Sequence, residues 1–338
     1  MKPSVLREKE IDRDSSIVNR QSSIVNSPRI LCPSCRVEIG PLEIVEAGNR
    51  QCAACGYCVE FTDGILRALL PERREFYQRF LKEYSSIRNA EERGSENDDY
   101  YLGLPFADLT GKHSGQWFIR GRSYRYLEER LLPELAGARA LDILDLGAGN
   151  GWLSYRLSLK GHRSVATDIR IDPKDGLAAS RHYVKRLGKG FPLVEAEFDL
   201  LPFSDAQFDL AVFNSSFHYS TSYLHTLTEA RRVLRPSGRI VILDSPLYRR
   251  AEHGDKMRME KHREFETRYG FRSDSIPSIE FLHEAALEEL AACLDLRWQI
   301  HRPWYGWSWH LRPWKARLKG RRPPASFRIL VGTWEMRS

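Results

Sequence analysis

The chain has 338 residues, of which 42% are hydrophobic and 29% charged, an ordinary composition for a soluble protein and a length sufficient for two domains. No apolar run is long enough to cross a bilayer, and the N-terminal residues contain no apolar signal core, so the sequence excludes a helical membrane protein and predicts a cytoplasmic one. The formal net charge of +7 permits a phosphate-rich or anionic partner without requiring one.

Residues 1–28 are polar and contain the sequence Ser-Ser-Ile-Val-Asn twice. Two copies with little apolar content are too few for a coiled coil, so this stretch is predicted to be a disordered tail.

Two Cys-x-x-Cys pairs follow, separated by sixteen residues, at Cys32, Cys35, Cys52 and Cys55. This spacing is typical of a four-thiolate zinc ribbon, which we expect over residues 29–70, with a structural zinc ion and no open coordination site. A disulfide pairing is the alternative. Cys58 could replace Cys55 as a ligand, whereas Cys293 lies far away in an amphipathic helix and is expected in the core.

Residues 71–135 are predicted to form a helical linker and a lid. Apolar side chains recur on one helical face at Phe76, Phe80, Leu81 and Tyr84, and a second amphipathic stretch covers residues 116–132. The acidic, tyrosine-rich residues 91–104 between them are expected to be a mobile lid.

Residues 141–153 read Leu-Asp-Ile-Leu-Asp-Leu-Gly-Ala-Gly-Asn-Gly-Trp-Leu, which predicts a buried strand, a tight turn and the start of a helix. Asp145 at the end of this strand is a candidate acceptor for a ligand ammonium, and the amides of the turn can donate to a carboxylate. A nicotinamide fingerprint would require glycine at the position of Trp152, so the turn fits a dinucleotide poorly.

A second strand ends at Asp168, whose carboxylate could accept both hydroxyls of a ribose. Capping of the following turn is the alternative role for this residue.

The glycine turn resembles motif I of the class I S-adenosylmethionine (SAM) dependent methyltransferases, and the resemblance covers residues 141–244, about half of the chain. The block over residues 231–244 is typical of the branch that includes quinone-biosynthesis enzymes. The cysteine segment resembles the zinc modules of a methyltransferase activator and of some rRNA methyltransferases, where it would contact substrate or brace the enzyme.

This resemblance implies that SAM contacts a set of residues at the carboxyl ends of the strands. They are Asp145, Gly147, Ala148, Gly149, Gly151, Asp168, Ile169, Glu197, Phe198 and Asn214. In the segment Ala-Glu-Phe-Asp before Leu-Pro-Phe, Glu197 occupies a position where the family usually has aspartate, so the adenine contact belongs either to Glu197 or to Asp199. Tyr100, Tyr101 and Trp117 are candidates for the roof of the SAM pocket, and core packing is an equal alternative for Trp117.

The resemblance further implies an α/β fold, a Rossmann-like, doubly wound, seven-stranded sheet within residues 136–338. The last two strands are expected at residues 296–301 and 327–333, forming a hairpin at the sheet edge. Insertions near residues 246–280 and 302–325 are expected to form a helical cap over the active site.

Catalysis is expected at residues 214–220, after the fourth strand, with His218 and Asn214 as the candidate catalytic residues. Neutral imidazole can take a proton near pH 7, so His218 is a candidate base, and a purely structural role has equal weight. The absence of an Asn-Pro-Pro-Tyr motif argues against methylation of an exocyclic adenine or a glutamine amide.

The last notable segment combines tryptophans and leucines at helical spacing with a series of basic residues between positions 304 and 322. Three interpretations compete, namely a surface that stacks on nucleic-acid bases, an amphipathic helix on an anionic membrane, and a cap over a hydrophobic acceptor. Pro313 interrupts a straight helix, which favours the cap. Tyr219, Trp304, Trp307 and Trp314 are therefore predicted to line the acceptor pocket.

Together these features predict a SAM-dependent methyltransferase that acts on a small or lipophilic acceptor and holds structural zinc. An RNA methyltransferase and a non-catalytic SAM-binding regulator are the alternatives. RNA binding, peripheral membrane contact and the oligomeric state stay open.

Overall fold

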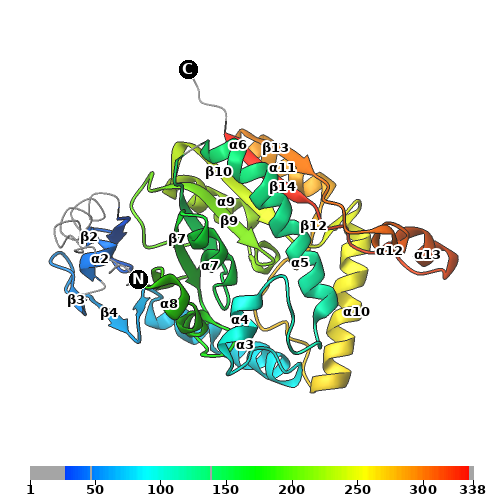
Figure 1. Ribbon diagram of the computed structural model, residues 1–338, viewed down its shortest axis with the longest axis horizontal. Coiled ribbons are helices and arrows are strands. Elements are labelled where there is room, and N and C mark those ends of the chain that lie inside the picture. Colours follow the sequence, from blue (N-terminus) through cyan, green and yellow to red (C-terminus); the bar gives the residue numbers. More distant parts are fainter. Residues whose placement is uncertain (1–26, 46–47, 138, 335–338) are drawn as a thin grey trace, which may run out of the picture.

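The computed structural model describes residues 27–45, 48–137 and 139–334 (Figure 1). The predicted disordered tail over residues 1–28 therefore lies outside the described residues except for its last two positions. Within the described residues no helix is long and apolar enough to cross a membrane.

The body is built on a twisted sheet whose seven central strands follow the order β13-β14-β10-β9-β6-β7-β8. Their bounds are Asp142–Leu146 for β6, Arg163–Asp168 for β7, Leu193–Glu195 for β8, Phe208–Asn214 for β9, Leu234–Leu243 for β10, Leu296–His301 for β13 and Ile329–Trp334 for β14. The five strands from β8 to β10 are mutually parallel, and β14 enters antiparallel between β10 and β13. The predicted doubly wound sheet and its edge hairpin are confirmed.

The sheet continues beyond β8 into the cysteine-containing segment, which makes it ten-stranded. Strand β5 (Ile65–Arg67) pairs in parallel with β8, and β4 (Cys58–Thr62) and β3 (Arg50–Gln51) follow it. Strands β1 (Arg29–Leu31) and β2 (Glu38–Pro41) form a separate pair. Because β5 supplies the hydrogen bonds that the edge of β8 would otherwise leave unpaired, this segment is an extension of the sheet.

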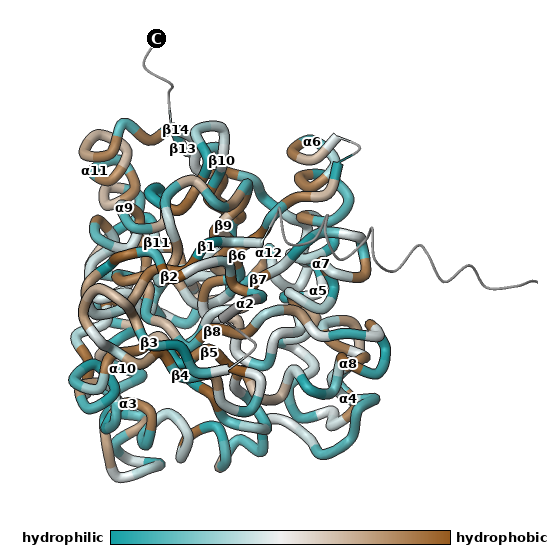
Figure 2. Tube along the Cα trace, turned by 90° about the vertical axis from the view of Figure 1, so that its left-hand side faces the viewer, coloured by the Kyte–Doolittle hydropathy of each residue, from teal (hydrophilic) through white to brown (hydrophobic). Residues whose placement is uncertain are grey.

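Both faces of the sheet are covered, as the alternation along β9 demonstrates. Leu210 and Val212 pack into one hydrophobic cluster, whereas Ala211 and Phe213 pack into the other. Hydrophobic stretches accordingly lie along β9 and β5 inside the body, and hydrophilic ones cover its surface (Figure 2).

The helices pack on the two faces and around the carboxyl ends of the parallel strands (Figure 1). Those interleaved with the sheet are α7 (Trp152–Leu159), α8 (Arg181–Leu187), α9 (Tyr223–Val233) and α11 (Glu284–Leu294). Those near the strand ends are α3 (Pro71–Ala90), α4 (Asp98–Gly103), α5 (Ser114–Tyr126) and α10 (Ala251–Tyr269). A π-helical turn, Leu127–Leu131, continues α5 into α6 (Leu132–Ala136).

Shorter elements complete the chain. They are α2 (Leu42–Val45), the 3-10 turns Leu177–Ser180 and Phe217–Tyr219, the strand pair β11 (Leu247–Tyr248) and β12 (Leu282–His283), and the short helices α12 (Trp307–His310) and α13 (Arg312–Leu318). Pro313 lies in the first turn of α13, so it ends α12 and starts α13 as its fixed φ and missing amide require.

Two packing predictions differ from the structure. Phe76 is exposed, and the buried face of α3 instead contains Tyr77, Phe80 and Ile87. Cys293 is exposed on α11, because that helix turns Leu287 and Leu290 toward the sheet.

Candidate active site

A cavity of about 1040 Å³, part of it open to solvent, lies at the carboxyl ends of β6, β7 and β9. Its lining includes most of the residues predicted to contact SAM, namely Asp145, Gly147, Ala148, Gly149, Asp168, Ile169, Glu197, Phe198 and Asn214. Gly151 does not line it and instead precedes α7 with a φ of 77°, where it packs against Phe191. We call this space the first cavity.

The glycine turn comes close to the loop after β9 at one position and leaves open space at another. A Cβ on Gly147 would lie 2.4 Å from the Cβ of Ser216, so only glycine fits there. At Gly149, where φ is 56°, a Cβ would meet only the carbonyl of Asp175 at 3.9 Å. The Gly149 position therefore keeps free space that a ligand can approach.

Asp145 is fully buried and only half satisfied. Its Oδ2 accepts a hydrogen bond of 2.9 Å from the Ser154 hydroxyl, but its Oδ1 has no partner within the described residues. Burial raises the pKa of this carboxyl to about 7. A buried carboxylate oxygen without a donor fits a ligand ammonium, since that cation would supply the missing hydrogen bond and charge.

The Asn214 side chain presents a similar feature. Its Oδ1 is buried without a partner and the residue lines the first cavity. It could accept a hydrogen bond from a ligand at the end of β9.

Asp168 is oriented by backbone amides on both of its oxygens. Gly149 donates to Oδ2 and Arg170 to Oδ1, each at 2.8 Å. Each oxygen retains a lone pair, so the carboxylate can still accept the two hydroxyls of a ribose. The bond from the Arg170 amide caps the turn after β7. Asp168 can therefore cap this turn and bind a ribose at the same time.

The structure separates the two candidates for the adenine contact. Glu197 lines the first cavity and is oriented by α3, where Arg73 donates to it at 2.6–3.0 Å and the Tyr77 hydroxyl at 2.9 Å. Asp199 instead accepts from the Thr226 hydroxyl and does not line the cavity. Sequence patterns missed Arg73 and Tyr77, although their spacing of four residues places them on one face of α3.

Only one of the three predicted roof residues lines the first cavity. Trp117 does so and packs edge-on against Trp152. Tyr100 and Tyr101 are buried away from it, and the Tyr101 ring stacks on His182 at 4.2 Å. The predicted lid is thus anchored on α8, while Phe80 and Tyr84 of α3 line the cavity in its place.

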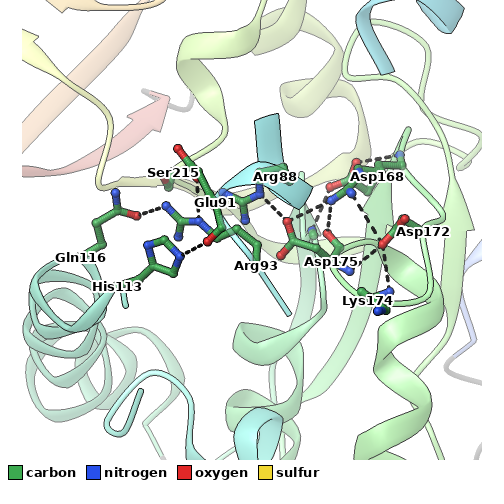
Figure 3. A network of polar contacts seen from close by, with 12 residues as sticks. Arg88, Glu91, Arg93, His113, Gln116, Asp168, Asp172, Lys174, Asp175 and Ser215 are labelled. Carbon is green, nitrogen blue, oxygen red and sulfur yellow. Dashed lines mark hydrogen bonds and ion pairs between the residues drawn. The ribbon is translucent and has the colours of Figure 1, made fainter. Parts of the chain in front are cut away.

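An ion-pair network ties α3 to the loop after β7 (Figure 3). The buried Asp175 pairs with Arg88 and accepts hydrogen bonds of 2.9 Å from Arg170. Arg88 and Arg170 lower the pKa of Asp175 even though burial opposes its ionisation. This network closes one side of the first cavity.

A second cavity, of about 1510 Å³, adjoins the first. The two share wall residues, namely Phe80, Tyr84, Arg88, Arg120, Ser215 and Tyr219. Helix α10, which lies within the segment 246–280 predicted as a cap, contributes Lys261 and Phe265 to the lining.

Arg120 stands at the border of the cavities without a carboxylate partner among the described residues. Its guanidinium lies over the Trp117 ring and donates to the Ser215 hydroxyl at 3.4 Å. Burial and the charge of Arg88 lower its pKa, and Asp244 partly offsets this. A desolvated guanidinium in this setting favours an anionic group on a bound ligand. No local sequence pattern marks this residue.

His218 and Asp244 both line the second cavity. Burial, with the charges of Lys261 and Arg120, lowers the pKa of His218 to about 3, so its imidazole is neutral at pH 7. Asp244 accepts from the Ser123 hydroxyl, its Oδ2 is buried without a partner, and burial raises its pKa. Asp244 is therefore a second group able to take a proton in this cavity, although no sequence pattern marks it for that role.

The predicted tryptophan wall is wrong. Trp304, Trp307 and Trp314 are 49%, 75% and 61% exposed and line neither cavity. Because the chain breaks into two short helices at Pro313, the inward positions fall to Trp309 and Arg312, which line the second cavity. Tyr219, the remaining predicted pocket residue, does line it.

The four predicted metal ligands converge. The sulfur atoms of Cys32, Cys35, Cys52 and Cys55 lie within 4.8 Å of one another. Each pair ends in a knuckle whose next residue, Arg36 or Gly56, has a positive φ and donates to the carbonyl of the first cysteine. Cys58 is exposed on β4 and lies outside this group. The geometry fits one metal ion with a closed set of four thiolates.

Part of the chain is similar to known methyltransferases. Residues 144–242 match the family model of a methyltransferase domain. The chain is 33% identical over 150 residues to the 27-O-demethylrifamycin SV methyltransferase of Amycolatopsis mediterranei, covering 41% of this chain and 55% of that protein. It is 31% identical over 165 residues to a ubiquinone/menaquinone biosynthesis C-methyltransferase of Brucella anthropi, covering 48% and 61%. The chain thus spans less than two thirds of the length of these relatives.

Among solved structures, the Burkholderia thailandensis 1,6-didemethyltoxoflavin N1-methyltransferase with bound 1,6-didemethyltoxoflavin and S-adenosylhomocysteine is similar, with 17% identity and a TM-score of 0.46. The alignment covers 85% of this chain and all of that one. From the family match and the relatives, the chain carries a class I, SAM-dependent methyltransferase domain of Rossmann-like fold.

Proposed function

We propose that this protein transfers the methyl group of SAM to a small, lipophilic acceptor bound in the second cavity. The observation that carries the proposal is the shared wall of the two cavities, formed by Arg120, Ser215 and Tyr219 among others. An acceptor in the second cavity is thereby adjacent to a cofactor in the first. The names of the two relatives, which refer to a demethylrifamycin and to quinone biosynthesis, support an acceptor of this kind.

The first cavity offers complementary partners for each part of SAM. Asp145 would hold the ammonium, Asp168 the ribose, and Glu197 with the Phe198 amide the adenine. Arg120 would hold the carboxylate of the methionine part, since its guanidinium lines this cavity and has no carboxylate partner among the described residues.

SAM supplies an electrophilic methyl group. The protein contributes positioning, which by itself accounts for much of the rate enhancement in such a transfer. Where the acceptor nucleophile carries a proton, His218 or Asp244 would remove it. Burial lowers the pKa of His218 to about 3 and raises that of Asp244, so burial weakens the imidazole as a base and strengthens the carboxylate, and we assign the base role to Asp244.

The four cysteines are proposed to bind one structural zinc ion. Closed thiolate coordination leaves no position for substrate, so the metal would join the β1–β2 turn to the β3–β4 turn and stabilise the fold there. Because β5 pairs with β8, the zinc segment braces the edge of the catalytic sheet.

An RNA methyltransferase is the second candidate, favoured by the zinc segment and by the basic residues after position 311. A non-catalytic SAM-binding regulator is the third. Oligomeric state enters none of these proposals.

The test is to incubate the protein with cell extract and SAM labelled in its methyl group. We expect label in small molecules that extract into organic solvent, and none with the Gly149→Val variant, whose side chain would enter the first cavity. Label recovered in RNA would replace the proposal with the second candidate. Calorimetric SAM binding without any labelled product would favour the regulator.

A further inference from the structure

Helices α12 and α13 form an arm that projects from the body beyond α10 (Figure 1). We use the term arm for residues 302–322. Five large apolar side chains of this arm are exposed, namely Trp304, Trp307, Leu311, Trp314 and Leu318. Every exposed tryptophan among the described residues lies here, so the apolar surface is concentrated on this arm.

The arm is also strongly basic. It contains seven arginine and lysine residues and no aspartate or glutamate. Arg322 pairs with Glu260, and Arg312 packs on Trp309, but the other cations remain on the surface. Lys315, Arg317 and Lys319 are exposed and form no ion pair within the described residues.

We propose that this arm docks the protein onto the surface of an anionic lipid bilayer. Tryptophans prefer the level of the lipid headgroups, leucines insert into the acyl boundary, and lysines and arginines pair with anionic headgroups. The exposed surface of the arm combines tryptophans, leucines and basic side chains, and it therefore matches both the charge and the apolar interior of such a bilayer.

The packing of the arm favours lipid over RNA. Stacking on bases requires free aromatic faces, and the Trp304 ring is already stacked on His310 at 4.3 Å, which leaves Trp307 and Trp314 for that role. Leu311 and Leu318, 44% and 67% exposed, offer nothing to a base but suit an acyl chain.

The same arm forms part of the second cavity through Trp309 and Arg312. Docking would therefore place this wall of the cavity beside the membrane. This consequence rests on the proposed function, because only a lipophilic acceptor would enter from the bilayer, whereas docking itself requires no turnover.

The experiment measures flotation of the purified full chain with two kinds of vesicle, one of phosphatidylcholine alone and one containing about 30% phosphatidylglycerol. We expect binding to the anionic vesicles that weakens as salt rises. The Trp307→Ser/Trp314→Ser variant should lose binding at least tenfold. The Lys315→Glu/Arg317→Glu/Lys319→Glu variant should lose at least about 100-fold, because removing three positive charges at about 1 kcal/mol each already gives that factor and the new negative charges add repulsion.

Matched controls come from exposed residues on other parts of the surface. Leu109→Ser removes an apolar side chain that is 59% exposed, and Lys185→Glu/Arg186→Glu/Lys189→Glu reverses three exposed charges around α8. Both controls should bind vesicles as the unaltered protein does. All variants should keep their SAM affinity, because the altered residues line neither cavity.

Quenching by brominated lipid gives a second readout. Trp307→Phe/Trp314→Phe should still float with anionic vesicles but lose most of the quenching, because those two rings are the proposed inserted chromophores.

Failure to bind anionic vesicles, or equal loss in the control variants, would overturn the proposal. Filter binding to RNA that the arm variants abolish, with vesicle binding unchanged, would assign the arm to RNA instead. Vesicle binding without methyl transfer would leave docking intact while refuting the proposed function.

Discussion

The buried carboxylate of Asp145 leads to a prediction in which stability and ligand binding change in opposite directions. Its pKa is raised from an ordinary 3.8 to about 7 because the charged form is desolvated. At about 1.4 kcal/mol per pH unit, ionisation costs the folded protein at most about 4 kcal/mol. Since the folded protein holds the proton more tightly than the unfolded chain, this cost is absent below pH 3.8, grows up to about pH 7 and is constant above.

Asp145→Asn removes that cost because the amide never ionises. We therefore expect the ligand-free variant to be more stable than the unaltered protein at pH 8 by up to about 4 kcal/mol, with the difference vanishing toward pH 4. Urea unfolding at several pH values measures this difference. SAM binding should weaken by about 1.5–3 kcal/mol, because the ligand ammonium loses its charged partner.

The affinity of the unaltered protein for SAM should fall about tenfold for each pH unit below 7, as Asp145 takes up a proton. Calorimetric titration from pH 5.5 to 8 measures this slope, which should be absent in Asp145→Asn. Asp199→Asn is the matched control, because its carboxyl is also partly desolvated but lies outside the first cavity. Unchanged SAM affinity in folded Asp145→Asn would refute the assignment of the ammonium to this oxygen.

Three further predictions concern the ribose, the metal and the chemical step. Asp168→Ala should weaken SAM binding by about 1.5–3 kcal/mol in calorimetry while folding persists, and an unchanged affinity would remove Asp168 from the site. Metal analysis should find one zinc per chain. The zinc should be lost in Cys52→Ser but kept in Cys58→Ser, because the Cys58 thiol lies outside the cluster. Zinc retained in both variants would contradict the ligand set. With an acceptor that loses a proton, Asp244→Asn should lower kcat by about 100-fold, and His218→Ala should lower kcat by a smaller factor. A larger loss of kcat in His218→Ala than in Asp244→Asn would make the histidine the base.

The site was predictable where its chemistry depends on backbone geometry close in sequence. The strand-turn-helix from Leu141 to Trp152 needs an apolar run and glycines at set positions, so the cofactor turn and Asp145 follow from the residues themselves. The two Cys-x-x-Cys knuckles are local in the same sense, and their four sulfurs meet as the spacing predicts.

Contacts between distant segments were not predictable in this way. Glu197 is oriented by Arg73 and Tyr77, which precede it by more than 100 residues, and no local pattern marks that pairing. Arg120 likewise appears as an ordinary basic residue on an amphipathic helix until the fold places it, half-buried, on the wall that two cavities share.

The amino-acid sequence by itself determined the glycine turn and the four-cysteine cluster, because each depends on dihedral preferences and short-range spacing. The sheet class followed from the resemblance of residues 141–244 to a known family. Only the tertiary structure decided which aromatic side chains face a cavity and which face solvent. Helical periodicity shows which side chains share one face of a helix, but it does not show whether that face contacts a cavity or solvent. A break at Pro313 therefore turned Trp309 inward and left Trp307 and Trp314 on the surface.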